Sequence, residues 1–179
     1  MTDQVTLTAP DGAVAEIEVP FPPLPLAGDA VETLLAHVLR PRPVGAVLVR
    51  KGGYAVGVFE GITLTASKVG SAYVQGKTKA GGWSQQRYAR RRANQTEQAY
   101  AVAADVAADL LLPRAEHLVG VFGGGDRVAV HAVLDDPRLG RLRGLLVEPV
   151  LPTVDPRLRV LQAFPEQFRA VSIRLNALA

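Results

Sequence analysis

The segment from Lys77 to Arg92 combines residue types that suit contact with a polyanion. Glycines flank its lysines on both sides, where a backbone without side chains can run close to another molecule. Trp83 and Tyr88 offer aromatic faces on which a base can stack. The segment also carries cations that can neutralise phosphates: Lys77, Lys79, Arg87, Arg90, Arg91 and Arg92. This combination predicts binding to a nucleic acid.

The charge of the whole chain is concentrated around this segment. The formal net charge is only +3, yet residues 61–96 hold seven Lys and Arg residues and no Asp or Glu. The remainder holds 13 basic and 17 acidic residues and is therefore slightly acidic. Because a single basic region on an otherwise acidic chain marks where a polyanion can be met, nucleic acid becomes the leading class of partner.

An ordinary structural explanation of this segment is a solvated hairpin tip followed by a charged helix start. Two features argue against it. A tryptophan that follows two glycines and has cations on both sides is hard to explain in this way. Arginines near a helix N-terminus also oppose the helix dipole, which costs roughly 0.3–1 kcal/mol each unless an anion is bound. A local rule broken without structural gain favours a functional site.

Composition excludes several other classes of protein. The 179 residues include no cysteine, so thiol chemistry, disulfides and cysteine-bound metals are excluded, and the three histidines are scattered. We therefore expect no metal and no cofactor. No apolar run approaches the ~20 residues that cross a bilayer, and the first residues are not those of a signal peptide. These observations predict a cytoplasmic protein without membrane contact.

Other candidate sites in the sequence are weaker. The glycine-rich stretch 120–126 lacks the spacing of a phosphate-binding loop, and a tight turn is the better interpretation. The histidines lie in apolar patterns, where packing is their commoner role: His37, His117 and His131. A metal-dependent nuclease would need converging carboxylates, and the candidates for these are Glu60, Glu97, Asp105 and Asp126.

The N-terminal region predicts a strand, a connector and a helix. Residues 14–19 alternate apolar and polar as a half-buried strand does, and four prolines follow between 20 and 25. Asp29 is placed to cap a helix that ends at Leu39, with an apolar face made by Val31, Leu34, Leu35 and Val38. We expect residues 1–28 to form the strand and connector, and residues 29–179 to form one α/β domain.

The rest of the chain predicts the architecture that would carry the basic segment. Short apolar runs separated by glycines predict an antiparallel meander of strands at 44–50, 54–59, 62–68 and 72–75. A single helix is expected from Ser84 to Leu112, because this stretch contains neither glycine nor proline. Alternating elements follow, with strands at 117–122 and 168–175 and helices at 126–134 and 157–164. The expected fold class is α/β, a mixed sheet in which the meander is followed by αβαβ, with helices on both faces.

The run Gly81-Gly82-Trp83-Ser84-Gln85-Gln86-Arg87, between a basic loop and a long helix, resembles the bacterial branch of the Vms-like release factors. That family consists of peptidyl-tRNA hydrolases related to the middle domain of the eukaryotic class-one termination factor. It uses a Gly-x-x-Gln loop where ordinary release factors have Gly-Gly-Gln, and Gly82-Trp83-Ser84-Gln85 matches it. The likeness extends over 40–175 at the level of fold and is motif-specific over 76–94.

The resemblance implies the roles of the site residues. Gln85 would be catalytic, with Gly81 and Gly82 letting the loop enter a narrow rRNA site, and Gln86 remains the alternative positioning residue. Because an amide neither takes nor gives a proton near neutral pH, Gln85 would place water and hydrogen-bond the transition state. RNA contacts would come from Lys77, Lys79, Trp83, Ser84, Gln86, Arg87, Tyr88, Arg90, Arg91 and Arg92.

The implied substrate is peptidyl-tRNA on the large ribosomal subunit, and the implied activity is release of nascent chains from stalled or split subunits. The rRNA would meet the basic loop. The alternative is a non-catalytic RNA-binding or ribosome-binding module that uses the same loop. A metal-dependent nuclease is a third class, distinguished by RNA cleavage that a chelator abolishes.

Overall fold

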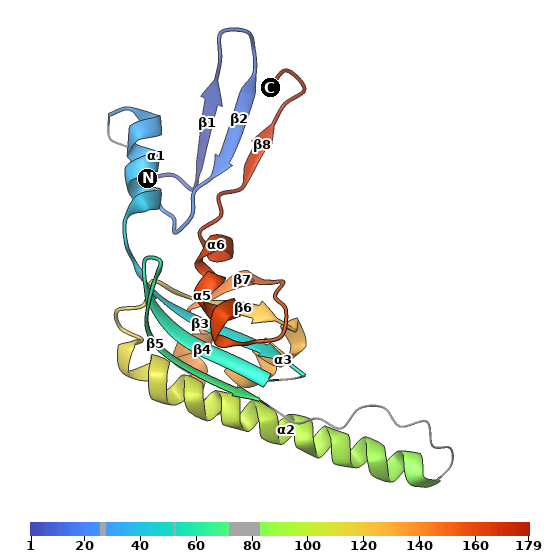
Figure 1. Ribbon diagram of the computed structural model, residues 1–179. Helices are drawn as coiled ribbons and strands as arrows, with labels where there is room; N and C mark the ends of the chain where they lie inside the picture. Colours follow the sequence, from blue (N-terminus) through green and yellow to red (C-terminus); the bar gives the residue numbers. More distant parts are fainter. Residues whose placement is uncertain (26–27, 52, 72–82) are drawn as a thin grey trace. The chain divides into compact units, whose positions relative to one another are not determined.

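The computed structural model describes residues 1–25, 28–51, 53–71 and 83–179, and between 83 and 93 the only side chain it describes is that of Arg90. The chain forms two compact units, one made of 1–41 with 165–179 and the other of 42–164. The boundary predicted at 28/29 falls inside the first unit. Figure 1 shows the elements of both units. Among the described helices, none combines the length and the apolar character needed to cross a bilayer.

The first unit joins the two ends of the chain in one sheet. Its antiparallel strands run in the order β1-β2-β8, with β1 spanning Gln4–Thr8, β2 Val14–Glu18 and β8 Ile173–Leu175. The unit also contains α1 (Ala30–Leu39) and α6 (Pro165–Phe168). The strand predicted at 14–19 and the helix predicted up to Leu39 are confirmed as β2 and α1, whereas β1 was not predicted. The predicted strand at 168–175 is shorter, because Phe168 belongs to α6 and only the last three residues pair with β2.

Helix α1 begins at the predicted cap, but its apolar face is narrower than expected. The carboxylate of Asp29 accepts hydrogen bonds from the backbone N–H groups of Val31 and Glu32, both at 2.9 Å. Leu34 is buried with residues of the small sheet, and Val38 packs beside it. Val31 and Leu35 are 50% and 57% exposed. The sheet of three short strands therefore covers Leu34 and Val38 and leaves Val31 and Leu35 exposed to solvent.

The second unit is built on a five-stranded mixed sheet in the order β5-β4-β3-β6-β7. The strands are β3 (Pro43–Arg50), β4 (Gly53–Glu60), β5 (Thr63–Ser71), β6 (Gly120–Gly125) and β7 (Leu146–Leu151). Strands β3, β4 and β5 form the predicted antiparallel meander, and β6 runs parallel to β3 and to β7. Strands β3 and β4 are buried over nearly their whole length, as expected for strands covered on both faces.

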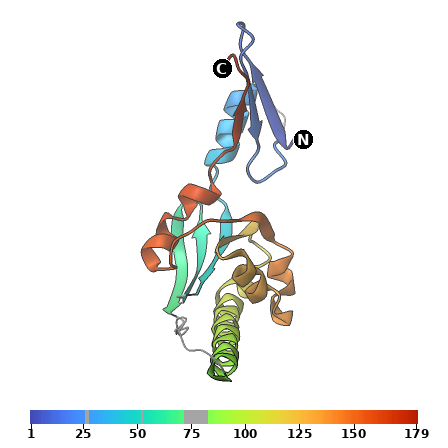
Figure 2. The ribbon, with the colours of Figure 1, turned by 90° about the vertical axis from the view of Figure 1, so that its right-hand side faces the viewer.

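Helices cover both faces of this sheet, which confirms the predicted fold class. A Cβ added to Gly45 would lie 3.4 Å from Leu111 of α2 (Trp83–Leu111), so α2 covers this face of the sheet. A Cβ added to Gly57 would lie 2.9 Å from Leu161 of α5 (Leu158–Ala163), so α5 covers the other face. Helix α3 (Arg127–Leu134) shares the core on the α2 side. Figure 2 looks almost along the α2 axis beside the strands. Shorter elements complete the unit, namely η1 (Leu112–Arg114), η2 (Pro137–Leu139) and α4 (Gly140–Arg143).

The glycine-rich stretch 120–126, predicted to be a turn, is a central strand. Strand β6 begins at Gly120, three residues later than predicted, and runs through the glycines. A Cβ on Gly123 would stand 2.7 Å from Val130 of α3, and one on Gly124 would stand 2.9 Å from Leu48 of β3. The glycines therefore allow α3 and the neighbouring strand to pack closely against β6.

Two other strands differ from the prediction. Strand β5 continues through Gly70 and Ser71, where a turn was expected, because these residues pair with Tyr54 and Gly53 of β4. The ring of Tyr54 occupies the space that a side chain at Gly70 would need. The predicted strand at 72–75 lies outside the described residues. Strand β7 was not predicted, since Glu148 and Pro149 interrupt its apolar pattern and proline is tolerated only at a sheet edge or a bulge.

Gly125 is a position where a side chain should be strongly destabilising. Its φ is +99°, and a Cβ there would stand 2.5 Å from the carbonyl oxygen of Val49. We expect Gly125→Ala to lower the free energy of unfolding by about 1–3 kcal/mol in urea denaturation. Gly140→Ala is the matched control, because that helical glycine has open space around it and should be neutral or slightly stabilising. Equal stabilities of the two variants would contradict this explanation.

Candidate nucleic-acid interface

Helix α2 is anchored at one end and free of the sheet at the other. Among the described side chains of α2, the buried ones are Ala103, Ala104, Val106, Ala107 and Leu111. Most of them are small, so the axis of the helix lies close to the sheet. Contact with the β3–β4 hairpin extends back to Thr96. The residues before it, 83–95, span ~20 Å at ~1.5 Å per residue. In Figure 1 this part of α2 extends past the end of the sheet.

The predicted site residues fall at the projecting end of α2. Trp83, Ser84, Gln85 and Gln86 form its first turn, so three residues of the Gly-x-x-Gln motif are helical. The backbones of Arg87, Tyr88, Arg91 and Arg92 follow in the next two turns. Arg90 is exposed. Gly81, Gly82, Lys77 and Lys79 lie outside the described residues, as do the side chains of the other site residues, so their roles stay predictions.

The electrostatics of this helix end favour an anion. The first N–H groups of a helix lack partners within the helix and carry the positive end of its dipole. The first turn of α2 contains no acidic residue that would offset this charge. The exposed Arg90 adds a cation one to two turns further along. Within the described part of the helix, these features favour an anion over a cation at the projecting end.

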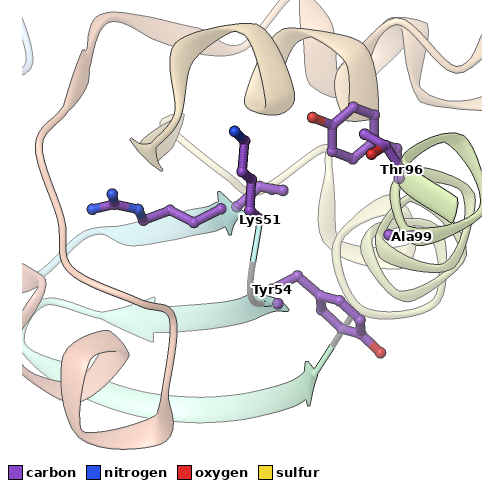
Figure 3. Close-up of a pocket in the computed structure, with 8 residues that line it drawn as sticks. Lys51, Tyr54, Thr96 and Ala99 are labelled. Carbon is purple, nitrogen blue, oxygen red and sulfur yellow. The ribbon is translucent and has the colours of Figure 1, made fainter. Parts of the chain in front are cut away.

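A small pocket marks where α2 leaves the sheet. Figure 3 shows Lys51 and Tyr54, from the β3–β4 hairpin, near Thr96 and Ala99 of α2, and Tyr100 also lines this pocket. Its volume of about 10 Å³ leaves room for about one water molecule. Burial raises the pKa of the Tyr100 hydroxyl above 10, and the negative charge of Asp126 raises it further. The pocket is thus a small gap in the contact between α2 and the β3–β4 hairpin, and it is too small for a substrate.

A larger groove of about 430 Å³ lies at the carboxyl ends of β3 and β6 and just beyond β7. It is lined by Arg50, Lys51, Gly125, Asp126, Pro152, Thr153 and Asp155. The Nη1 atom of Arg50 donates a hydrogen bond of 2.7 Å to the carbonyl oxygen of Thr153, and its Nε lies 3.8 Å from a carboxylate oxygen of Asp155. Lys51 makes no ion pair with any described residue.

Sequence reasoning missed this groove, although part of a signal was present. Arg50 and Lys51 are adjacent cations at the end of a buried strand, directly before a glycine pair. Neighbouring cations at a strand end are a weak sign of an anion site when taken alone. Thr153 and Asp155 join them only because β6 pairs in parallel with both β3 and β7.

Four of the histidines and carboxylates considered in the sequence are held by structural contacts. His37 Nε2 lies 3.0 Å from the carbonyl oxygen of Pro20, and His131 Nε2 lies 3.1 Å from a carboxylate oxygen of Glu148. Asp105 pairs with Arg138 at 2.8 Å. Asp126 caps α3 by accepting from the N–H groups of the helix's second and third residues. Within the described ranges, no three metal-binding side chains come together.

Arg138 also shows how charges outside the basic segment are used. It donates hydrogen bonds to both carboxylate oxygens of Asp136, at 2.9 and 2.7 Å. These bonds hold the pKa of Asp136 at about 2, well below its usual value. Arg141 and Arg143 likewise pair with Glu116 and Asp135. These cations are partnered within the fold, which contrasts with Lys51.

Comparison with known proteins identifies similar chains. Residues 42–174 match the family model described as the Actinobacteria/chloroflexi VLRF1 release factor. The crystal structure of an archaeal translation termination factor, aRF1, superposes with a TM-score of 0.55 at 21% identity, covering 91% of this chain and 50% of that one. A structure described as an archaeal protein gives a TM-score of 0.45 at 19% identity, covering 88% of this chain and 48% of that one.

The chain thus spans about half the length of each of these two solved structures. No curated protein matches the sequence. At this identity the likeness to the archaeal factor concerns the fold alone, and it agrees with the mixed sheet and long helix described above.

Thr153 offers a test of the groove's packing. Its hydroxyl oxygen is buried and has no hydrogen-bond partner among the described residues. Because an unpartnered buried hydroxyl costs about 1–3 kcal/mol, we expect Thr153→Val to raise the free energy of unfolding by roughly 1 kcal/mol. Thr153→Ser, which keeps the hydroxyl and removes the methyl group, should not be stabilised. A destabilised Thr153→Val protein in urea titrations would show that the hydroxyl is satisfied.

Proposed function

The chain belongs to the Actinobacteria/chloroflexi VLRF1 release factor family, and from this premise we propose that it hydrolyses peptidyl-tRNA on the large ribosomal subunit. The bond cleaved is the ester between the nascent peptide and the terminal ribose of the tRNA. The physiological role would be release of nascent chains from stalled or split large subunits in the cytoplasm. The protein itself supplies no metal or cofactor in this mechanism.

The observation that carries the proposal is the position of Gln85 in the first turn of a helix that projects ~20 Å from its anchor. The ester lies inside the ribosome's active centre, which a compact domain cannot enter. A narrow projecting element is therefore the part of this fold able to reach it. The glycines before the helix, Gly81 and Gly82, leave the approaching segment without bulky side chains.

The chemistry we propose is water positioning. The amide of Gln85 both donates and accepts hydrogen bonds but does not titrate, so it orients a water molecule against the ester carbonyl without acting as a base. Attack of the water oxygen on the carbonyl carbon gives a tetrahedral intermediate, which collapses as the bond to the ribose oxygen breaks. That oxygen takes up a proton and the peptide leaves as its acid. Donors aimed at the developing oxyanion lower the barrier, and rRNA would provide much of this environment.

The basic segment would hold the protein on rRNA. We propose phosphate contacts through Lys77, Lys79, Arg87, Arg90, Arg91 and Arg92, and stacking or polar contacts through Trp83, Ser84, Gln86 and Tyr88. The exposed Arg90 and the absence of acidic residues from the first turn of α2 support this assignment. The same arrangement would serve a non-catalytic RNA-binding module, so activity has to be tested separately from binding.

Replacing Gln85 tests the catalytic assignment. We expect Gln85→Ala to lower the rate of peptide release from peptidyl-tRNA on purified large subunits by at least about 100-fold, since the group that orients the nucleophile is removed. Ribosome binding, measured by co-sedimentation, should be retained. Gln86→Ala is the matched control on the same turn of the helix.

The outcomes separate the candidate functions. Wild-type rates in Gln85→Ala together with loss of release in Gln86→Ala would transfer the positioning role to Gln86. Salt-sensitive binding without release by the wild type would establish the non-catalytic module. Cleavage of RNA that EDTA abolishes would indicate a nuclease.

Removing three arginines tests the basic surface. We expect the Arg90→Ala, Arg91→Ala, Arg92→Ala triple variant to bind large subunits more weakly. The slope of log K against log salt should become shallower by about 0.7–0.9 for each phosphate that the variant no longer neutralises. The control is the double variant Arg141→Ala, Arg143→Ala, which removes exposed arginines paired within the fold. An unchanged slope in the triple variant would remove the basis for the RNA-binding assignment of these arginines.

A further inference from the structure

We propose that the groove at the carboxyl ends of β3, β6 and β7 binds a phosphate of the RNA backbone through Lys51 and Arg50. This inference rests on the proposed function, because it adds a second RNA contact on the body of the domain, away from the projecting end of α2. Neither cation belongs to the basic segment recognised in the sequence.

The position of the groove in the sheet favours a ligand. From β3 the chain passes outward through β4 and β5 on one side, and then returns through α2 to β6 and β7 on the other side. The carboxyl ends of the parallel strands β3 and β6 therefore meet where the direction of strand order reverses. In open sheets of this kind, ligands bind in the crevice outside such a switch point. The volume of about 430 Å³ is sufficient for one ribose–phosphate unit.

Arg50 is held in place by a hydrogen bond and Lys51 is not, and both can still bind an anion. Arg50 is fixed through its hydrogen bond to the carbonyl oxygen of Thr153, which leaves further guanidinium donors unused, and its side chain is 46% exposed. Its contact with Asp155 is long, at 3.8 Å, and solvated. Lys51 is exposed in the turn and has no partner among the described residues. A fixed guanidinium beside a free ammonium suits a phosphate.

The carboxylates of the groove favour an RNA backbone over an isolated anion. Asp126 is occupied as the cap of α3, accepting hydrogen bonds of 3.0 and 3.3 Å. Asp155 is 68% exposed and can accept a hydrogen bond from a hydroxyl group. A backbone nucleotide offers both partners, a phosphate for the cations and a 2′-hydroxyl for the carboxylate.

The groove also lies near the proposed RNA surface. Lys51 lines both the groove and the pocket where α2 leaves the hairpin, so it lies beside Thr96. Arg90 is six residues before Thr96 and hence ~9 Å away along the helix axis. Figure 1 shows the β3–β4 turn at the end of the sheet from which α2 projects. One strand of RNA can therefore contact the projecting end of the helix and the groove together.

The test compares Lys51→Ala with Lys68→Ala in the full-length protein. Lys68 is the matched control, an exposed lysine on β5 that lines neither the groove nor the helix pocket. Binding to purified large subunits is measured directly and as the half-saturating concentration for peptide release. We expect Lys51→Ala to weaken binding about tenfold, as removal of one charge-assisted hydrogen bond would, with an unchanged maximal rate and a shallower salt slope. Lys51→Arg should restore binding, and Lys68→Ala should match the wild type.

Each other outcome is decisive. Equal binding by Lys51→Ala and Lys68→Ala would overturn the inference while leaving the Gln85 result untouched. A tighter, Lys51-dependent affinity for inorganic phosphate than for RNA, measured by calorimetry, would reassign the groove to a small anion and also overturn it. Weakened binding in Lys51→Ala, even if the wild type proves inactive in release, would support the groove and reject only the hydrolase.

Discussion

The packing of the C-terminal half of α2 against the sheet is the contact on which the rest of the second unit depends. Alanines at 103, 104 and 107 bring the helix close to β3 and β4, and Leu111 closes the core beneath Gly45. Because this half is fixed, the N-terminal part of the helix before Thr96 can extend past the end of the sheet. The same helix thus provides both the hydrophobic anchor and the element that carries the predicted catalytic motif. The direction in which the helix projects is set by its contact with the β3–β4 hairpin around Thr96 and Tyr100.

Charged residues on the body of the second unit differ from those near the projecting end of α2 in whether acidic residues accompany them. On the described body of the second unit, several arginines are paired with carboxylates and stabilise local structure, as Arg138 does with Asp105 and Asp136. Around the projecting end of α2, basic residues have no acidic neighbours in sequence, and the first turn offers no acidic residue to the helix dipole. Such an arrangement costs stability in the free protein and is compensated when an anion binds. Lys51 belongs with this second group although it lies on the body.

Local signals in the sequence predicted much of the fold. Asp29 and Asp126 cap the helices that follow them, and a stretch without glycine or proline became α2. The predictions that were wrong or missing concern strands whose structure depends on contacts with residues distant in sequence. Strand β6 is rich in glycine because α3 and β3 pack closely on it, β8 depends on pairing with β2, and β7 tolerates Pro149 at a sheet edge. The proposed catalytic motif was identified in the sequence through its resemblance to a release-factor family, whereas Arg50, Thr153 and Asp155 meet only through parallel strand pairing.

Above all, we propose that α2 carries Gln85 to the peptidyl-tRNA ester. Electron cryomicroscopy of the Gln85→Ala variant, trapped on large subunits that hold peptidyl-tRNA, tests it most directly. We expect position 85 to lie beside the ester bond, with α2 directed toward the peptidyl transferase centre and the sheet outside it. Density for the bound protein with the N-terminal end of α2 away from the tRNA 3′ end would contradict this claim.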